Sequence, residues 1–297
     1  MIQFIGSTIG FILLAYQILK SFSAINKNII PDFNIWMLFL SLLFAFFALI
    51  FQILGWLSIN KSLGYNFPLK NIFFGYTFTF LPRYVPGSIW GYLTRSEWLL
   101  RDYKIPYHDS LFVSSVEMGV IFLVNILLGS YFLPTSTTKT FGTLIFFLLL
   151  LFLIPLKNFF TNFPKIKYYT ELFYKINIVS WIYILSSFLL SWFLYGIGLK
   201  FTMHAFSISS NFDLSSILLI TSINSISWLL GFIIIFIPAG IGIRELFLNY
   251  LLINTFTIPS GISSSIAVSY RLISLLAELF LLVIGFLILR ITTSYKS

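Results

Sequence analysis

The sequence predicts an all-α fold, a polytopic membrane bundle of about eight helices with additional re-entrant segments broken by proline and glycine. Two observations predict this class. Hydrophobic residues make up 59% of the 297 residues and charged residues only 9%, whereas soluble globular chains carry about 25% charged residues. Long apolar runs such as residues 36–56 are continuous, whereas strands of a transmembrane barrel would alternate between apolar and polar residues.

Runs long enough to cross about 30 Å of hydrocarbon define the expected helices. They cover residues 3–19, 36–57, 110–132, 141–155, 178–199, 214–237 and 262–289. Two further segments, 72–93 and 241–256, are apolar but interrupted or short, and we expect re-entrant hairpins or half-helices there. The first run lacks a basic n-region and a small-residue cleavage site, so we interpret it as a membrane helix and not as a cleaved signal peptide.

The chain is expected to form a single integral membrane domain over residues 1–297. Its half-repeats are 1–135 and 178–290, and a basic linker at 157–177 joins them. The distribution of lysine and arginine predicts a multi-pass protein of the cell (inner) membrane whose linker and C-terminus are cytoplasmic. The orientation of the N-terminus stays open, because the same rule holds whether 72–93 crosses the membrane or re-enters it.

Composition narrows the classes of function. The net charge of +9 comes mostly from loops beside apolar segments, so it is explained by topology and anionic headgroups and not by nucleic acid. The chain has no cysteine and only two histidines, which are far apart, so we expect neither a metal site nor a cofactor. The longest connection, 157–175, is too short for a soluble catalytic domain, which usually needs at least about 50 residues. Four tryptophans are expected near membrane interfaces, namely Trp56, Trp90, Trp98 and Trp181.

Two motifs interrupt the apolar sequence, one in each half. Residues 82–91 read PRYVPGSIWG, and residues 238–245 read PAGIGIRE. Because proline lacks an N–H and glycine frees the backbone, helix breaks are expected at Pro86, Gly87, Pro238, Gly240 and Gly242. Broken helices in a membrane are tolerated where the freed backbone groups face protein or a wet cavity. Each motif is therefore expected to mark a cavity.

A helix that begins with small polar residues and carries an acid follows each motif. The residues concerned are Ser110, Ser114, Ser115 and Glu117 in the first half, and Ser263, Ser264, Ser265, Ser269, Arg271 and Glu278 in the second. This order of features occurs twice, which predicts an internal repeat and points to a transporter's binding site. Identity between the copies is weak, and proline and glycine are common in membrane helices, so a chance alignment is the alternative.

Charges within or beside the apolar stretches are the candidate ligand-binding groups. They are Arg95, Arg244, Arg271, Glu117, Glu245 and Glu278. A charge near the bilayer centre costs about 2.5–3.5 kcal/mol on insertion scales, so it normally faces the bundle interior and has a partner. Guanidinium groups match phosphate, so the arginines are expected to receive an anionic headgroup. The glutamates would hold the arginines in the empty site or bind a coupling proton or cation.

Two structural alternatives for these charges stay open. The charges can form static ion pairs between helices, and residues 95–109 can be an ordinary cytoplasmic loop. Arg271 and Glu278 share a helix face but lie seven residues apart, too far for an ideal contact. Each is therefore expected to find its partner on another helix.

The motifs resemble the transmembrane family of lysylphosphatidylglycerol synthases and flippases. The run Tyr84–Trp90 with Arg95 and Ser114–Glu117 resembles its first signature, and residues 238–245 with 270–272 resemble its second. The resemblance implies two re-entrant elements that meet at a lipid-accessible cavity. Its better-known members move aminoacylated phospholipid between leaflets, and others are associated with polyprenol-linked sugars and cell-surface glycans. Carried over, the three candidate arginines would be headgroup contacts and the three glutamates their partners.

The leading hypothesis is a flippase that moves an anionic phospholipid or a polyprenyl-phosphate-linked sugar. The sequence lacks the soluble aminoacyl-transfer domain of two-domain family members, which argues against synthase activity. One alternative is a membrane-embedded lipid or glycosyl transferase, which would need clustered acids near the surface; the surface aspartates are scattered singly. Another is an accessory subunit that recruits a cytoplasmic or membrane transferase through the linker.

Overall fold

The computed structural model describes residues 33–79, 90–131, 164–208, 212–234 and 237–294, together with Leu19 and Pro82. Within these residues all regular secondary structure is helical. The helices expected at 3–19 and 141–155, and the first break with Pro86 and Gly87, lie outside the described residues.

Five described helices are long and apolar enough to cross a membrane. They are α2 (Ile35–Ser62), α5 (Tyr107–Ser130), α8 (Ile178–Ala205), α9 (Leu214–Ile233) and α11 (Ser260–Ser294). The shorter elements are α3 (Leu69–Phe78), α4 (Trp90–Tyr103), α7 (Pro164–Lys175), the 3-10 turn η2 (Pro238–Gly240) and α10 (Ile243–Phe256). This architecture confirms the predicted class, a multi-pass helical membrane bundle.

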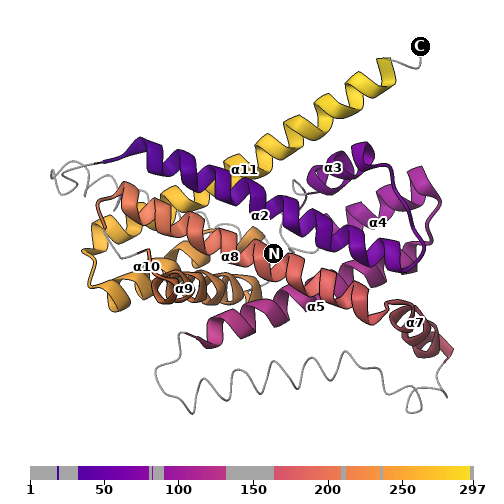
Figure 1. Cartoon of the computed structure of the whole chain (residues 1–297), viewed down its shortest axis with the longest axis horizontal. Helices are drawn as coiled ribbons and strands as arrows, with labels where there is room; N and C mark the ends of the chain where they lie inside the picture. Colours follow the sequence, from indigo (N-terminus) through magenta and orange to yellow (C-terminus); the bar gives the residue numbers. More distant parts are fainter. Residues whose placement is uncertain are drawn as a thin grey trace.

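Helices α2 and α8 lie side by side and antiparallel in the middle of the molecule (Figure 1). At one end the backbone N–H of Asn34 donates to the carbonyl of Ala205 at 3.0 Å. Near the other end, a Cβ added to Gly55 would lie 2.6 Å from the ring of Phe188, so glycine permits this close approach. The two ends of the α2–α8 pair define the two ends of the bundle, and the other helices are described below relative to them.

We call one of these ends the linker end, where the C-terminus of α2, the N-terminus of α5 and helix α7 meet. Asp109, in the first turn of α5, accepts hydrogen bonds from Tyr65 at 2.5 Å and from Tyr168 of α7. His108 Nε2 lies 3.1 Å from the same carboxylate. The Asp109 side chain is buried, so it does not belong to a solvated loop as the sequence allowed. The hydrogen bond to Asp109 raises the pKa of the Tyr168 hydroxyl to about 12.

Two pairs of helices open toward opposite ends of the bundle. Phe67, just before α3, packs against Tyr103 at the end of α4 with ring centroids 4.9 Å apart, so α3 and α4 both reach the linker end. The other end holds the start of α9, where Ser216 accepts a hydrogen bond from Lys200 of α8. Leu252, near the end of α10, packs in the same apolar cluster as residues of the C-terminal part of α8. Helices α9 and α10 thus form a hairpin that opens away from the linker.

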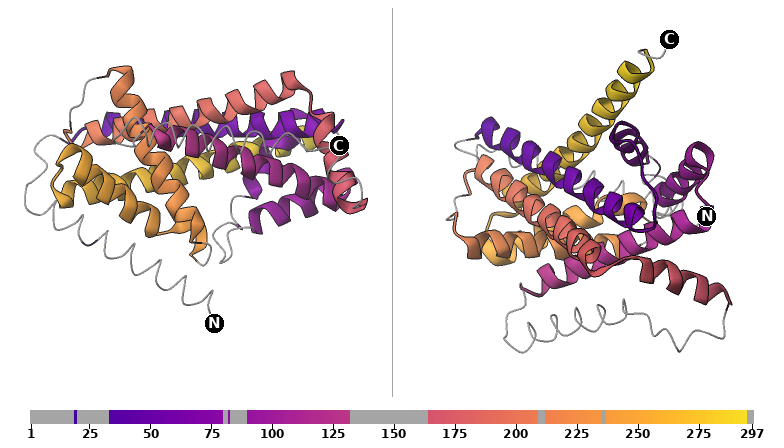
Figure 2. Two further views of the ribbon diagram at one scale, coloured as in Figure 1. Left: turned by 90° about the horizontal axis from the view of Figure 1, so that it is seen from below. Right: turned by 45° about the vertical axis from the view of Figure 1, so that its right-hand side comes forward.

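Helix α11 follows α10 and crosses the whole bundle. Its first turns pack in the cluster with α8, α9 and α10, and its later part lies against α3. A Cβ added to Gly285 would lie 3.0 Å from the backbone of Phe74. The final part of α11 projects past α3, as Figure 1 and the right-hand view of Figure 2 show.

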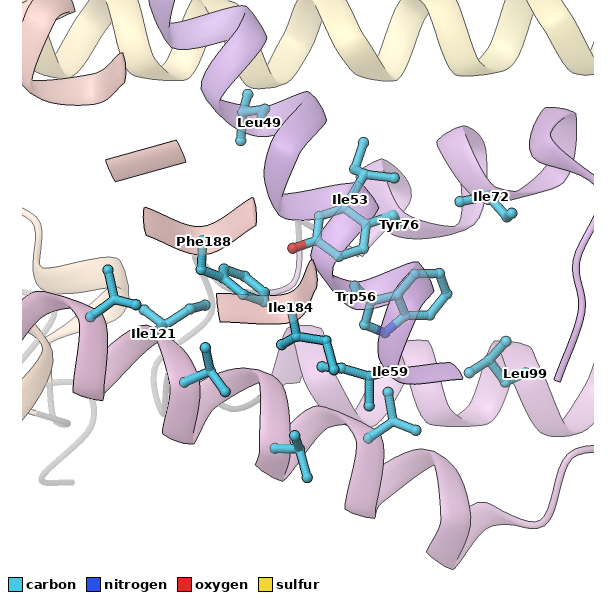
Figure 3. Packing of buried hydrophobic residues seen from close by; sticks show 14 of the residues in the cluster. Leu49, Ile53, Trp56, Ile59, Ile72, Tyr76, Leu99, Ile121, Ile184 and Phe188 are labelled. Carbon is cyan, nitrogen blue, oxygen red and sulfur yellow. The ribbon is translucent and has the colours of Figure 1, made fainter. Parts of the chain in front are cut away.

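The larger apolar core lies between α2, α3, α4, α5 and α8 (Figure 3). Trp56 is fully buried there, and its ring stacks on Phe67 with centroids 5.9 Å apart. Trp98 is also buried. Both tryptophans are therefore packed inside the protein, because α3 and α4 fold back over the end of α2. Their depth in the membrane stays a prediction.

Helix α4, the linker and the end of α9 differ from the sequence prediction in ways that affect the packing. Helix α4 continues through residues 95–103, which the sequence also allowed as a loop, because one face of this polar stretch is buried. The linker contains helix α7, whose Leu172 packs into the core. Helix α9 ends at Ile233, four residues before the predicted end at 237, since the approach to Pro238 disfavours helical backbone.

Candidate functional site

The break before α10 has the backbone that its sequence demands. Residues Ala239, Gly240 and Gly242 have φ values of +50°, +65° and +83°, a left-handed region that favours glycine. At Gly240 space is also limiting, because an added Cβ would lie 2.8 Å from the carbonyl oxygen of Gly231. The structure thus places the helix break where Pro238, Gly240 and Gly242 predicted it.

Glu245 closes the start of α10. Its Oε2 accepts the backbone N–H of Gly242 at 2.6 Å, which satisfies a donor that the helix itself leaves free. Its Oε1 lies 3.3 Å from Nε of Arg271 on α11. Arg271 Nη2 also donates to the carbonyl of Ala239 at 3.3 Å. Arg271 therefore has its partner on another helix, as expected, and ties α11 to the turn of the hairpin.

Arg244 lies beside the Glu245–Arg271 ion pair, and its stem packs against α9. A Cβ added to Gly231 of α9 would lie only 2.1 Å from Cγ of Arg244. The missing side chain at Gly231 is therefore what lets the stem of Arg244 lie against α9.

A small cavity lies where α2, α8, α9, α10 and α11 meet. Its volume is about 60 Å³, enough for a few water molecules. Its polar lining includes Arg244, Arg271, Glu278, Asn224, Tyr270 and Gln52. Tyr270 donates to the carbonyl of Tyr195 at 2.8 Å and accepts from Asn224 at 3.3 Å.

Trp192 also lines the cavity, and its buried indole N–H has no hydrogen-bond acceptor among the described residues. Buried donors are normally paired with protein or ordered water. The cavity is therefore suited to polar contents.

Arg95 and Glu117 form a second charge cluster, away from the residues that line this cavity. Arg95 Nη1 donates to Glu117 Oε2 at 2.6 Å, and both side chains are almost fully buried. Tyr76 donates to Glu117 Oε1 at 2.7 Å, and Arg95 Nε donates to Thr79 at 3.2 Å. The guanidinium carbon also lies 4.0 Å from the centre of the Tyr76 ring and 5.4 Å from that of Trp56. Protein groups therefore surround Arg95 on several sides.

Both clusters contain an arginine–glutamate pair on two consecutive helices, but the order of arginine and glutamate along the chain is reversed. In the first, the arginine is on α4 and the glutamate on the following helix α5. In the second, the glutamate is on α10 and the arginine on the following helix α11. Helix α2 passes both, since Trp56 contacts Arg95 and Gln52, one turn away, lines the cavity.

The structure sorts the candidate residues of the sequence into these two places. It brings Arg244, Glu245, Arg271 and Glu278 together around the start of α10 and the cavity. Sequence reasoning missed four uncharged members, namely Tyr76, Thr79, Gln52 and Asn224. Tyr270 was included only through the family resemblance. A single amide in an otherwise apolar helix, as at positions 52 and 224, is the signal that could have found two of them. No group of three acidic or histidine side chains suited to a metal ion occurs in the described part of the chain.

Comparison with known proteins gives one match. A family model described as the lysylphosphatidylglycerol synthase TM region matches residues 3–285, which agrees with the resemblance carried by the two motifs. No curated protein and no solved structure matches the chain.

Proposed function

Because the chain belongs to the lysylphosphatidylglycerol synthase transmembrane family, we propose that it is a flippase for an anionic phospholipid or a sugar-phosphate-linked lipid. The observation that carries this proposal is the charged cavity at the broken start of α10. Two guanidinium groups, Arg244 and Arg271, border it inside an apolar bundle. An arginine pair beside a helix N-terminus is suited to a phosphate.

In this proposal the headgroup enters between Arg244 and Arg271 while the acyl chains stay in the bilayer. Glu245 and Glu278 balance the arginines in the empty site. A volume of about 60 Å³ lies far below the roughly 300–1,000 Å³ of ligand pockets. The α9–α10 hairpin must therefore move away from α11 to admit a headgroup, and the arrangement described is the occluded one.

The two helix pairs that open toward opposite ends support a re-entrant, inverted repeat. Helix α10 has 14 residues, about 21 Å at 1.5 Å per residue, which is shorter than the roughly 30 Å hydrocarbon layer. Transporters with inverted repeats bind substrate where broken helices of the two halves meet. We place the linker and the C-terminus in the cytoplasm of a cell with this protein in its inner membrane, following the lysine and arginine distribution.

We assign Arg95 and Glu117 a different role from Arg244. Arg95 already has a carboxylate, a hydroxyl and aromatic rings as partners. A headgroup would have to displace Glu117 from a 2.6 Å contact. The pair is better suited to hold α4 against α5 while the second hairpin moves.

The test is lipid movement in vesicles. Phosphatidylcholine vesicles would carry a trace of fluorescent phosphatidylglycerol or fluorescent phosphatidylcholine, with dithionite added outside. Wild-type protein should expose the inner-leaflet phosphatidylglycerol to the quencher, and Arg244→Gln should not. Lys167→Gln, a change on the exposed surface of α7, is the matched control. Movement that is equal in wild type and Arg244→Gln would refute the assignment of the cavity. Absence of lipid movement by the wild-type protein itself would favour the accessory-subunit alternative.

A further inference from the structure

A second and larger hollow lies on the side of the bundle, between α2, α8 and the start of α3. Its volume is about 570 Å³, within the range of ligand pockets, and it is separate from the charged cavity. We call it the α2–α8 groove. On α2 it is lined at positions 51, 54, 57, 58 and 61, which form one stripe of the helix. The stripe is about 15 Å long, because residues 51 and 61 are ten residues apart at 1.5 Å per residue.

The lining changes from apolar to polar along this length. Phe51 and Leu54 of α2 lie at one end, and Leu190 of the antiparallel α8 lies beside them. Lys61, in the last turn of α2, lies at the linker end together with Tyr65 and Asn66. Residues of α8 follow the same gradient, since Tyr183 is at the polar end. An amphiphile with a polar head at the membrane surface and an apolar tail within the bilayer has the same gradient.

Among the described residues, Lys61 is the only charged one that lines the groove. The lysine is exposed, and no carboxylate of the described residues lies within ion-pair distance of it. Asn66 and Ser187, which also line the groove, have side chains without a hydrogen-bond partner in the described part of the chain. Tyr65, which lines the groove, donates its hydroxyl to the carboxylate of Asp109. That carboxylate also accepts the Tyr168 hydroxyl, so it already has two hydrogen-bond donors. The polar end therefore offers a cation and donors to an anion.

We propose that the α2–α8 groove binds one anionic phospholipid from the leaflet at the linker end. Its phosphate lies at Lys61, with the side-chain amide of Asn66 as a further donor. One acyl chain lies along Phe51, Leu54 and Leu190. Basic pockets between membrane helices bind anionic headgroups in this way, most often on the cytoplasmic side. A lipid in this place bridges α2, α8 and Ile72 of α3, so it supports the α3–α4 pair and is not cargo of the charged cavity.

The first experiment measures lipid retention. Protein purified in mixed micelles would be offered phosphatidylglycerol and phosphatidylcholine with identical acyl chains, and bound lipid would be counted by native mass spectrometry. Wild type should retain one phosphatidylglycerol in preference to phosphatidylcholine. Lys61→Gln should reduce that preference about fivefold, the equivalent of the roughly 1 kcal/mol that one basic residue contributes near a membrane surface. Lys61→Arg should keep it, and so should the control Lys167→Gln on α7.

A second experiment locates the lipid. A photoreactive residue in place of Leu190 should crosslink to phospholipid in membranes, and Ser187→Trp should abolish that crosslink by filling the groove. Arg244→Gln, which is expected to stop lipid movement, should leave the crosslink from position 190 unchanged. Loss of movement without loss of the crosslink would separate this site from the proposed transport site. Equal retention of the two lipids by wild type would overturn the proposal. So would an unchanged preference in Lys61→Gln, or a crosslink from position 190 to another protein segment or a second copy.

Discussion

The buried Arg95–Glu117 pair gives the sharpest prediction for stability. Replacing Glu117 by alanine leaves the guanidinium of Arg95 in the core without its carboxylate, and it removes the acceptor of the Tyr76 hydroxyl. Both side chains are within 3% of full burial, so solvent cannot replace the lost partner. Removing one member of a buried pair typically costs about 3–5 kcal/mol. We expect a loss in that range in the free energy of unfolding.

Two further variants separate the charge from the contacts. Glu117→Gln keeps an acceptor for Tyr76 but removes the negative charge, so it should cost less than Glu117→Ala. The double variant Arg95→Met with Glu117→Leu removes both charges, and replacing a buried pair by apolar residues is often nearly neutral. The double variant should therefore be more stable than Glu117→Ala alone.

Unfolding in mixed micelles titrated with sodium dodecyl sulfate, followed by circular dichroism, measures these differences. A loss of less than about 1 kcal/mol in the free energy of unfolding of Glu117→Ala, which is the range of an exposed ion pair, would refute this prediction. An additive result would also refute it, namely a cost of the double variant equal to the summed costs of Arg95→Met alone and Glu117→Leu alone, because contacting residues should be coupled.

The remaining predictions concern the hairpin turn and helix α7. Gly231→Ala should destabilise the protein by about 1–3 kcal/mol through overpacking, because the added Cβ would lie 2.1 Å from Cγ of Arg244. It should also reduce lipid movement. The double variant with Arg244→Ala should recover stability but not lipid movement. Gly119→Ala, where nothing lies within 4 Å, is the control in the same denaturation assay and should be nearly neutral. The pKa of Tyr168 is raised to about 12 by its hydrogen bond to Asp109, so the stabilisation of α7 by this hydrogen bond should be complete below pH 10 and decline as the pH rises through about 12. Proteolysis or labelling of α7 across that range measures the loss, and Tyr168→Phe should show no such step; an unchanged α7 in the wild type at pH 12 would contradict the assignment.

The sequence was sufficient for the class, the family and the second helix break. Continuous apolar runs predict membrane helices, and the structure has helices there. Proline and glycine at 238–245 predict a helix break, and the backbone is left-handed at that point. The charged residues that border the cavity were among those singled out from the sequence, because an ionisable group in an apolar helix is costly enough to be noticed.

Other features depend on contacts between distant segments and could not be predicted. Helix α4 has too polar a sequence to look buried, and its buried face is set by α2 and α5. Trp56 sits near the end of an apolar run, so its burial is decided by α3 and α4 folding over it. The order of motifs predicted a repeat, but which arginine pairs with which glutamate follows from the packing of α5 and α11.

The carboxylate of Glu245 on the Gly242 N–H has a consequence for exchange of ligands. It is an anion already bound at the helix start, held there by three residues of chain and so present at a very high effective concentration. If the cavity binds headgroups as proposed, an incoming headgroup competes with this internal ligand for the N–H and for Arg271. Neutral headgroups would then be excluded, and a strong anion would bind with reduced affinity. Such a site would be selective and would still release its ligand, as the proposed transport requires.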